Sequence, residues 1–183
     1  TGTQFWHVAA VSLYRYGAIF RSAVARADRQ IAGHRPEPLM AITKEQATAY
    51  RKQLAALDLK KPEDMAKYKA LRRVVIEAGE GCRYESYTDT KGCMTVGIGC
   101  NMDANRNEWK EAFGKNGPDY DKVHDKERQL TQKEVEQLYA YMVGKREKQL
   151  REEIYPKVWD KLKPNERLAI EDLFYNGGKC IAH

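Results

Sequence analysis

The segment GEGCRYESYTDTKGCMTVGIG, residues 79–99, marks a change from helical to extended periodicity. Upstream of it, apolar side chains recur at three- and four-residue intervals, which predicts a helix from about Glu63 to Gly79. The two glycines of the G-E-G triplet end that helix. β-Branched and aromatic residues at 83–87 and 93–96 then predict two short strands joined by a turn at 89–92. The segment therefore predicts a helix followed by an antiparallel hairpin.

The rest of the chain has a mainly helical pattern. An amphipathic helix is predicted over residues 4–32, and the proline pair within 33–38 predicts a linker after it. Capping-box patterns at Thr43–Gln46 and Thr131–Glu134 predict the starts of two more helices, the second of them long. Pro164 suits the first turn of a further helix. The predicted fold class is α+β, mostly α, with one small antiparallel sheet.

Composition and charge limit the classes of function. With 42% apolar and 32% charged residues, the chain is expected to form a packed globular fold rather than a disordered one. The formal net charge is +6, and residues 1–68 carry +5 of it. This excess favours polyanionic partners such as nucleic acid, anionic lipid or anionic cell-wall polymers. Because no basic groove interleaved with aromatic residues is apparent, no specific nucleic-acid partner is predicted.

The cysteine pattern argues against a metal site. Cys82, Cys93, Cys100 and Cys180 form no C-x-x-C pair and have no histidines at zinc spacing. Neither a metal nor another cofactor is predicted. Three of the cysteines lie close together in sequence, so one disulfide in an oxidising compartment is one interpretation, and small buried thiols are the favoured alternative.

Two carboxylates around the hairpin are candidates for acid–base chemistry. Glu80 is expected at the negative end of a helix, which disfavours its ionised form and should raise its pKa, as a general acid requires. Asp89 follows in the hairpin turn, where solvent and turn amides should keep it ionised, and Thr95 begins the return strand. Two carboxyl groups about 6.5–9.5 Å apart would leave room for an attacking water, as in inverting glycosidases. The alternative is structural: Asp89 caps its turn, Thr95 favours a strand and Glu80 is a solvated helix end.

Several segments resemble the phage-type lysozymes, muramidases with an E-x8-D-x5-T catalytic pattern. Glu80, Asp89 and Thr95 match that pattern residue for residue. The resemblance covers about residues 66–183, and its most specific block is Y-x-D-x-x-G-x-x-T-x-G-x-G. The matching segments are GEG at 79–81, YTDTKGCMTVGIG at 87–99, LTQKEVEQLYAYMV at 130–143 and LKPNERLAIEDLFYNGG at 162–178.

The resemblance implies a lysozyme-like fold with a hairpin lobe, a long linking helix and a helical lobe. It also implies cleavage of the bond between N-acetylmuramic acid and N-acetylglucosamine in peptidoglycan. Glu80 would protonate the leaving oxygen, while Asp89 and Thr95 would position the attacking water in an inverting reaction. The glycan strand would lie between the lobes. Residues implied to bind it are Tyr87, Asn101, Phe174 and Tyr175, although Phe174 and Tyr175 fit equally well as core aromatics.

The chain also departs from the family pattern. Cys100 stands where the family often has a histidine, so the supporting interaction of that histidine is expected to be absent. The sequence stops at His183, where family members continue with further helices, so the C-terminal lobe is expected to be incomplete. The expected organisation is a basic helical extension over 1–62 and a lysozyme domain over 63–183.

The extension suggests the biological setting. A basic helical extension before the domain is typical of a lysozyme carried by a phage particle, so we expect a virion protein that acts in the host periplasm and cell wall. Its N-terminal helices are expected to contact other virion proteins. The alternatives are a free endolysin for host lysis, and a structural or ejection protein whose lysozyme domain serves mainly in assembly.

Overall fold

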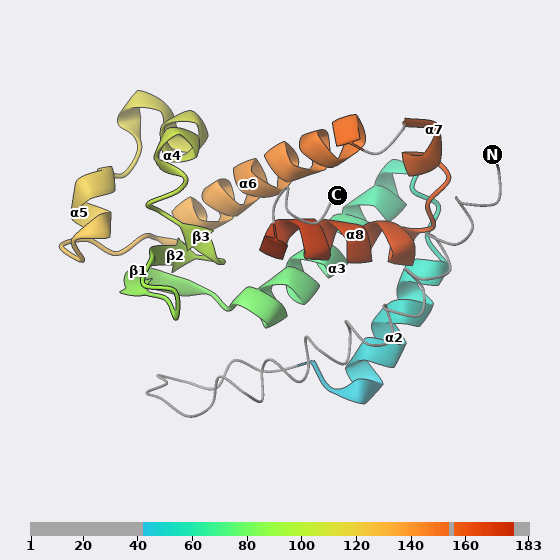
Figure 1. Cartoon of the computed structure of the whole chain (residues 1–183). Coiled ribbons are helices and arrows are strands. Elements are labelled where there is room, and N and C mark those ends of the chain that lie inside the picture. Colours follow the sequence, from blue (N-terminus) through green and yellow to red (C-terminus); the bar gives the residue numbers. More distant parts are fainter. Residues whose placement is uncertain (1–41, 154–155, 178–183) are drawn as a thin grey trace.

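The computed structural model describes residues 42–153 and 156–177 (Figure 1). The helix predicted over 4–32, the linker predicted over 33–38 and Cys180 lie outside these ranges. Three consecutive strands form one small sheet, with helices before and after them in the chain. In chain order they are α2 (Lys44–Ala55), α3 (Pro62–Glu80), β1 (Arg83–Thr88), β2 (Met94–Gly97), β3 (Cys100–Asn101), α4 (Arg106–Phe113), the 3-10 helix η2 (Gly114–Asn116), α5 (Tyr120–His124), α6 (Gln132–Glu153), α7 (Pro156–Trp159) and α8 (Pro164–Gly177).

Both predicted capping boxes are present. The Thr43 amide donates to Gln46 Oε1 at 2.9 Å, and the Gln46 amide donates to Thr43 Oγ1 at 3.2 Å. At the start of α6 the Thr131 amide donates to Glu134 Oε2 at 2.8 Å, and the Glu134 amide donates to Thr131 Oγ1 at 3.3 Å. Each pair satisfies two amides that a helix N-terminus would otherwise leave unpaired. α2 and α6 therefore begin where their local sequences predict.

The predicted hairpin, β1 and β2, is part of a three-stranded antiparallel sheet in the order β1-β2-β3. Thr95 of β2 pairs with Tyr87 of β1 on one side and with Asn101 of β3 on the other. The sequence did not predict β3. It forms because Gly97 and Gly99 adopt φ values of +63° and +66°, which turn the chain back directly after β2. The G-I-G triplet is thus the β2–β3 turn.

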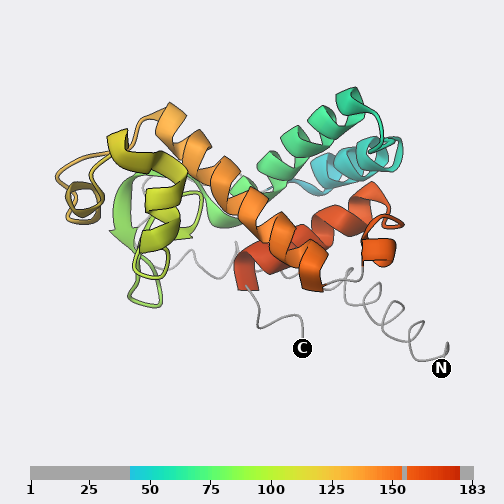
Figure 2. The same cartoon turned by 90° about the horizontal axis from the view of Figure 1, so that it is seen from above.

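Helix α6 joins two lobes (Figure 2). The sheet, α4 and α5 lie at one of its ends, and α2, α3, α7 and α8 gather toward the other. The sheet packs on α6 through Val96 and Ile98, which share a buried cluster with Val135 and Leu138. This arrangement confirms a mostly helical α+β fold with a small hairpin lobe and a long linking helix.

The segment between the sheet and α6 gave no helix prediction, yet it folds into α4, η2 and α5. Trp109 organises it: its ring makes edge contacts with Phe113 and Tyr120, at centroid distances of 4.8 and 5.6 Å. The buried indole Nε1 donates to the Pro118 carbonyl at 3.0 Å. These helices are short and depend on packing of the aromatic side chains, which explains why their local sequence was ambiguous.

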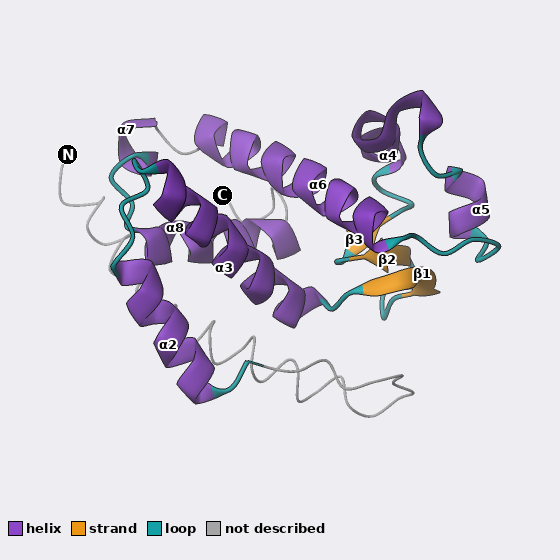
Figure 3. Cartoon of the chain, turned by 180° about the vertical axis from the view of Figure 1, so that it is seen from behind, coloured by secondary structure: helices purple, strands orange, loops and turns teal. Residues whose placement is uncertain are grey.

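Helix α2 packs within the helical lobe (Figure 3). Leu54 of α2, Tyr68 of α3 and Leu168 of α8 are each at most 4% exposed and form one apolar cluster. The domain boundary expected between residues 62 and 63 falls in the first turn of α3, and α2 and α3 share this cluster. α2 therefore packs as part of the same lobe as α3 and α8.

A buried ionic network also fixes the helical lobe. Glu171 of α8 accepts hydrogen bonds from the Tyr68 hydroxyl at 2.7 Å and from Arg72 at 3.0 Å. Arg72 also donates to Glu147 of α6 at 3.2 Å. Arg72 and Glu171 are 6% and 5% exposed, so each depends on the other for compensation of its charge. The network sets how α3, α6 and α8 face one another.

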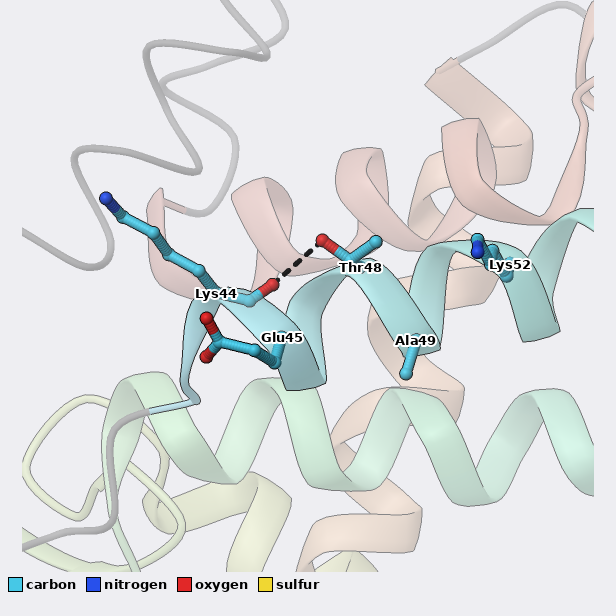
Figure 4. Close-up of a pocket in the computed structure, with 5 residues that line it drawn as sticks. All are labelled: Lys44, Glu45, Thr48, Ala49 and Lys52. Atoms are coloured by element: carbon cyan, nitrogen blue, oxygen red, sulfur yellow. Dashed lines mark hydrogen bonds between the residues drawn. The ribbon is translucent and has the colours of Figure 1, made fainter.

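The outer face of α2 bears a shallow pocket lined by Lys44, Glu45, Thr48, Ala49 and Lys52 (Figure 4). The Thr48 hydroxyl is occupied by a hydrogen bond to the Lys44 carbonyl at 2.9 Å. Among the described residues, all that line this pocket belong to one helix. Over the described ranges, no helix has the length and apolarity needed to cross a bilayer.

Candidate active site

Glu80 is the last residue of α3 and is half-buried. The helix stops there because Gly81 adopts φ = +78°, a conformation that strongly favours glycine, and its amide caps the Glu77 carbonyl at 2.7 Å. The carboxylate thus lies at the negative end of the helix dipole, as predicted.

The β2–β3 turn packs directly on the Glu80 side chain. An added Cβ at Gly99 would clash with Glu80 Oε2 and would lie only 3.0 Å from Cδ and from Cγ. Only a residue without a side chain allows the turn to approach the carboxyl group so closely. Gly99 thus brings the β2–β3 turn against Glu80.

The two carboxylate oxygens of Asp89 make different contacts. Oδ1 accepts hydrogen bonds from the Lys91 and Cys93 amides at 2.8 and 2.9 Å, which caps the hairpin turn. Oδ2 lies 3.5 Å from Thr95 Oγ1, and the buried Thr95 hydroxyl is also 3.5 Å from the Cys93 carbonyl. Both contacts are long for a hydroxyl hydrogen bond. The structural and the catalytic interpretations of Asp89 are therefore compatible, because they use different oxygen atoms.

The charges of both candidate carboxylates act on Tyr87. Burial raises the pKa of Tyr87, the Arg83 guanidinium opposes that rise, and the Glu80 and Asp89 charges add to it. Arg83 stacks over the Tyr87 ring at 4.0 Å. Tyr87 also pairs with Thr95 across the sheet.

The other predicted substrate-binding residues have different settings. Asn101 Oδ1 accepts a hydrogen bond from the Ala104 amide at 2.9 Å, so its side chain holds a turn. Phe174 is 2% exposed in a cluster with Leu150 and Trp159, which corresponds to the alternative of a core aromatic. Tyr175 is half-buried, and its hydroxyl donates to the Ile98 carbonyl at 2.7 Å.

The three described cysteines, Cys82, Cys93 and Cys100, are free thiols. Burial, with a further contribution from the Glu108 charge, raises the pKa of Cys100 to about 12, so this residue of β3 is an inert apolar group. In the described part of the chain, no group of three or more His, Cys, Asp or Glu side chains could hold a metal ion.

A profile of the phage lysozyme family matches residues 77–182, which is more than half of the chain. The chain belongs to the phage lysozyme family. The matched range contains Glu80, Asp89 and Thr95, and membership makes the protein a glycoside hydrolase that degrades peptidoglycan. Comparison with curated proteins found no significant match.

Two contacts of this lysozyme site could not be predicted from sequence. For the contact of Gly99 with Glu80, the G-I-G triplet predicts a tight turn but does not indicate which residue the turn contacts. No sequence pattern indicates the hydrogen bond from Tyr175 to Ile98, since a tyrosine in a helix does not reveal a distant acceptor.

Proposed function

We propose that this lysozyme hydrolyses the glycosidic bond between N-acetylmuramic acid and N-acetylglucosamine with inversion at the anomeric carbon. Glu80 is the general acid, and Asp89 and Thr95 position the attacking water. The observation that carries the proposal is that a helix-end carboxylate packed against Gly99 and a turn carboxylate bound by two backbone amides lie in unlike settings, on a helix end and on the hairpin that follows it. Pairs of carboxyl groups in contrasting environments are what glycoside hydrolysis uses.

The setting of Glu80 suits a proton donor. The C-terminal end of α3 disfavours an ionised carboxylate, and the backbone of Gly99 covers one side of the group. A protonated carboxyl there can donate to the leaving-group oxygen of the glycan.

The setting of Asp89 suits a base. Two backbone amides donate to Oδ1, and these hydrogen bonds hold the carboxylate in the hairpin turn. Oδ2 and the Thr95 hydroxyl are left to bind a water on the opposite side of the sugar ring from Glu80. Because neither contact of Thr95 is shorter than 3.5 Å, its hydroxyl can reorient toward such a water.

The test of this function is Glu80→Gln, with Glu77→Gln as a matched control on the same helix. Glu77 pairs with Arg73 one turn before the helix end, so its loss removes a similar charge without touching the site. We expect Glu80→Gln to lose about 100- to 10,000-fold in the rate of reducing-end release from purified peptidoglycan. Glu77→Gln should stay within about twofold of the parent. A Glu80→Gln variant that retains full activity would contradict the proposed mechanism.

Inversion is tested separately by following the first-formed anomer by NMR. The cleaved bond has the β configuration, so an inverting enzyme releases the α-anomer first. Initial release of the β-anomer would show retention, and would leave Asp89 as a nucleophile instead of a base.

We also propose that the enzyme is part of a phage particle, contacts other virion proteins and opens the host cell wall during entry. The support is indirect: residues 1–68 hold most of the net charge, and α2 packs on the lysozyme core although it precedes the family match. Immunoblots of purified virions and of infected-cell cytoplasm test this. Protein found in the cytoplasm but absent from virions would instead support the alternative of a free endolysin.

An assembly role is the competing function, and the basic N-terminal third is the feature that favours it. Particles assembled with Glu80→Gln distinguish the two. Normal infectivity of such particles supports an assembly role, while failure at the cell wall supports an enzymatic one.

A further inference from the structure

The Tyr175 hydroxyl connects the two lobes of the molecule. Tyr175 lies in the last turn of α8, in the helical lobe, and donates a 2.7 Å hydrogen bond to the Ile98 carbonyl in the β2–β3 turn. Its ring packs against the main apolar cluster and lies 6.2 Å from the Tyr139 ring. A side chain 77 residues further along the chain thus holds this turn.

The turn that Tyr175 holds is the one that contacts the proposed acid. Ile98 is followed directly by Gly99, whose backbone lies against the Glu80 carboxyl group. The Ile98 side chain is 2% exposed, so it is fixed in the core beside α6. Any movement of the peptide at Ile98 therefore moves Gly99 relative to Glu80.

The hydroxyl also has the chemistry of a stable donor. Burial raises the pKa of Tyr175 well above its ordinary value. The phenol consequently keeps its proton at every pH at which a glycosidase with a carboxylic general acid works.

We propose that Tyr175 is a positioning residue for the general acid: its hydroxyl fixes the β2–β3 turn at Ile98, and through Gly99 the turn fixes the Glu80 carboxyl group. This inference rests on the proposed role of Glu80. It assigns Tyr175 a task other than the glycan contact that the family resemblance implied.

The role has a defined consequence for catalysis. Without the hydroxyl, the Ile98 carbonyl loses its side-chain partner and the turn can shift away from Glu80, which lets more water reach the carboxyl group. A displaced acid lowers the rate of the chemical step while leaving binding of distant sugars intact. A more hydrated carboxyl ionises more readily, so the alkaline limb of the pH–rate profile should move to lower pH.

The experiment compares Tyr175→Phe with Tyr139→Phe in the full chain. Both changes remove one hydroxyl from neighbouring rings of the same cluster and keep the rings in place. The Tyr139 hydroxyl is buried and has no hydrogen-bond partner of normal geometry within the described ranges, although the Arg72 guanidinium lies near it. Kinetics on soluble, uncrosslinked glycan strands give kcat and KM, and amide hydrogen exchange reports on residues 98–100.

For Tyr175→Phe we expect kcat to fall about tenfold with KM within about twofold. The alkaline limb should move to lower pH, and the amides of residues 98–100 should exchange faster. Tyr139→Phe should match the parent in all of these. Glu80→Gln is run alongside: if it remains active, the proposed function fails and not this inference alone.

Three results would overturn the inference while leaving the proposed function in place. In one, Tyr175→Phe keeps the parental kcat and pH profile. In another, KM rises with kcat unchanged, which indicates a direct contact with substrate. In the third, Tyr139→Phe loses as much activity as Tyr175→Phe, which indicates a general effect of the apolar cluster.

Discussion

Gly99→Ala should separate backbone strain from displacement of the acid. Gly99 has φ = +66°, so alanine there costs about 1–2 kcal/mol of stability through backbone strain alone. Its Cβ would also lie 3.0 Å from the carboxyl carbon of Glu80, where ordinary contact begins at 3.4 Å. The carboxyl carbon must therefore retreat by about 0.4 Å, and Oε2, which is closer, by more.

The matched control for this prediction is Gly114→Ala. Gly114 has nearly the same φ, +65°, but no atom lies within 4 Å of an added Cβ. Both variants should lose at least about 1 kcal/mol, seen as a lower Tm. Only Gly99→Ala should also lose activity, by about 10- to 100-fold, because misplacing a catalytic group by about 1 Å costs on the order of 100-fold.

The assays are thermal unfolding by circular dichroism and reducing-end release from purified peptidoglycan, measured at a temperature where both variants are folded. If Gly99→Ala keeps the parental rate, contact between the turn and Glu80 does not position the acid. Equal loss of activity in Gly114→Ala would mean that strain, rather than the contact, lowers the rate.

The remaining predictions concern stability. Arg72→Met should destabilise the fold by about 3–5 kcal/mol in urea unfolding, because it leaves the buried Glu171 charge unpaired. The double variant with Glu171→Leu should recover part of this loss. A single variant as stable as the parent would refute the role of the network. His124 forms hydrogen bonds with Asp125 at 2.9 Å and with Asp103 at 3.0 Å, and these bonds raise the pKa of His124. The stabilisation of the fold by His124 should therefore be complete below about pH 6.5, and it should disappear as the pH rises through the higher pKa that His124 has in the folded state. His124→Gln should flatten that part of the pH–stability curve, and an unchanged curve would contradict the prediction. Phe174→Ala should cost about 3–5 kcal/mol as a core truncation, whereas a stable variant with a raised KM would show that Phe174 binds the glycan.

The local sequence was sufficient where short-range interactions decide the structure. The capping boxes before α2 and α6 use residues three apart, so their starting points follow from the sequence directly. The Asp89 turn likewise depends on amides two and four residues away. Local patterns likewise place Glu80, Asp89 and Thr95 on a helix end and an adjoining hairpin, whereas their catalytic roles were implied by the family resemblance.

The short elements after the hairpin could not be predicted from the local sequence. β3 has two residues and depends on the backbone of β2 for its pairing. Helices α4 and α5 depend on the packing around Trp109. Elements this short have too little intrinsic preference to be recognised without their tertiary partners.

The sequence by itself determined that a helix ending in Glu80 meets a hairpin carrying Asp89 and Thr95, because helical and extended periodicities and turn residues act over a few positions. Only the tertiary structure decided what surrounds Glu80. The contacts of Gly99 with Glu80 and of Tyr175 with Ile98 join segments 19 and 77 residues apart. Such contacts depend on how the sheet and α8 pack around α6, and no local pattern records that geometry.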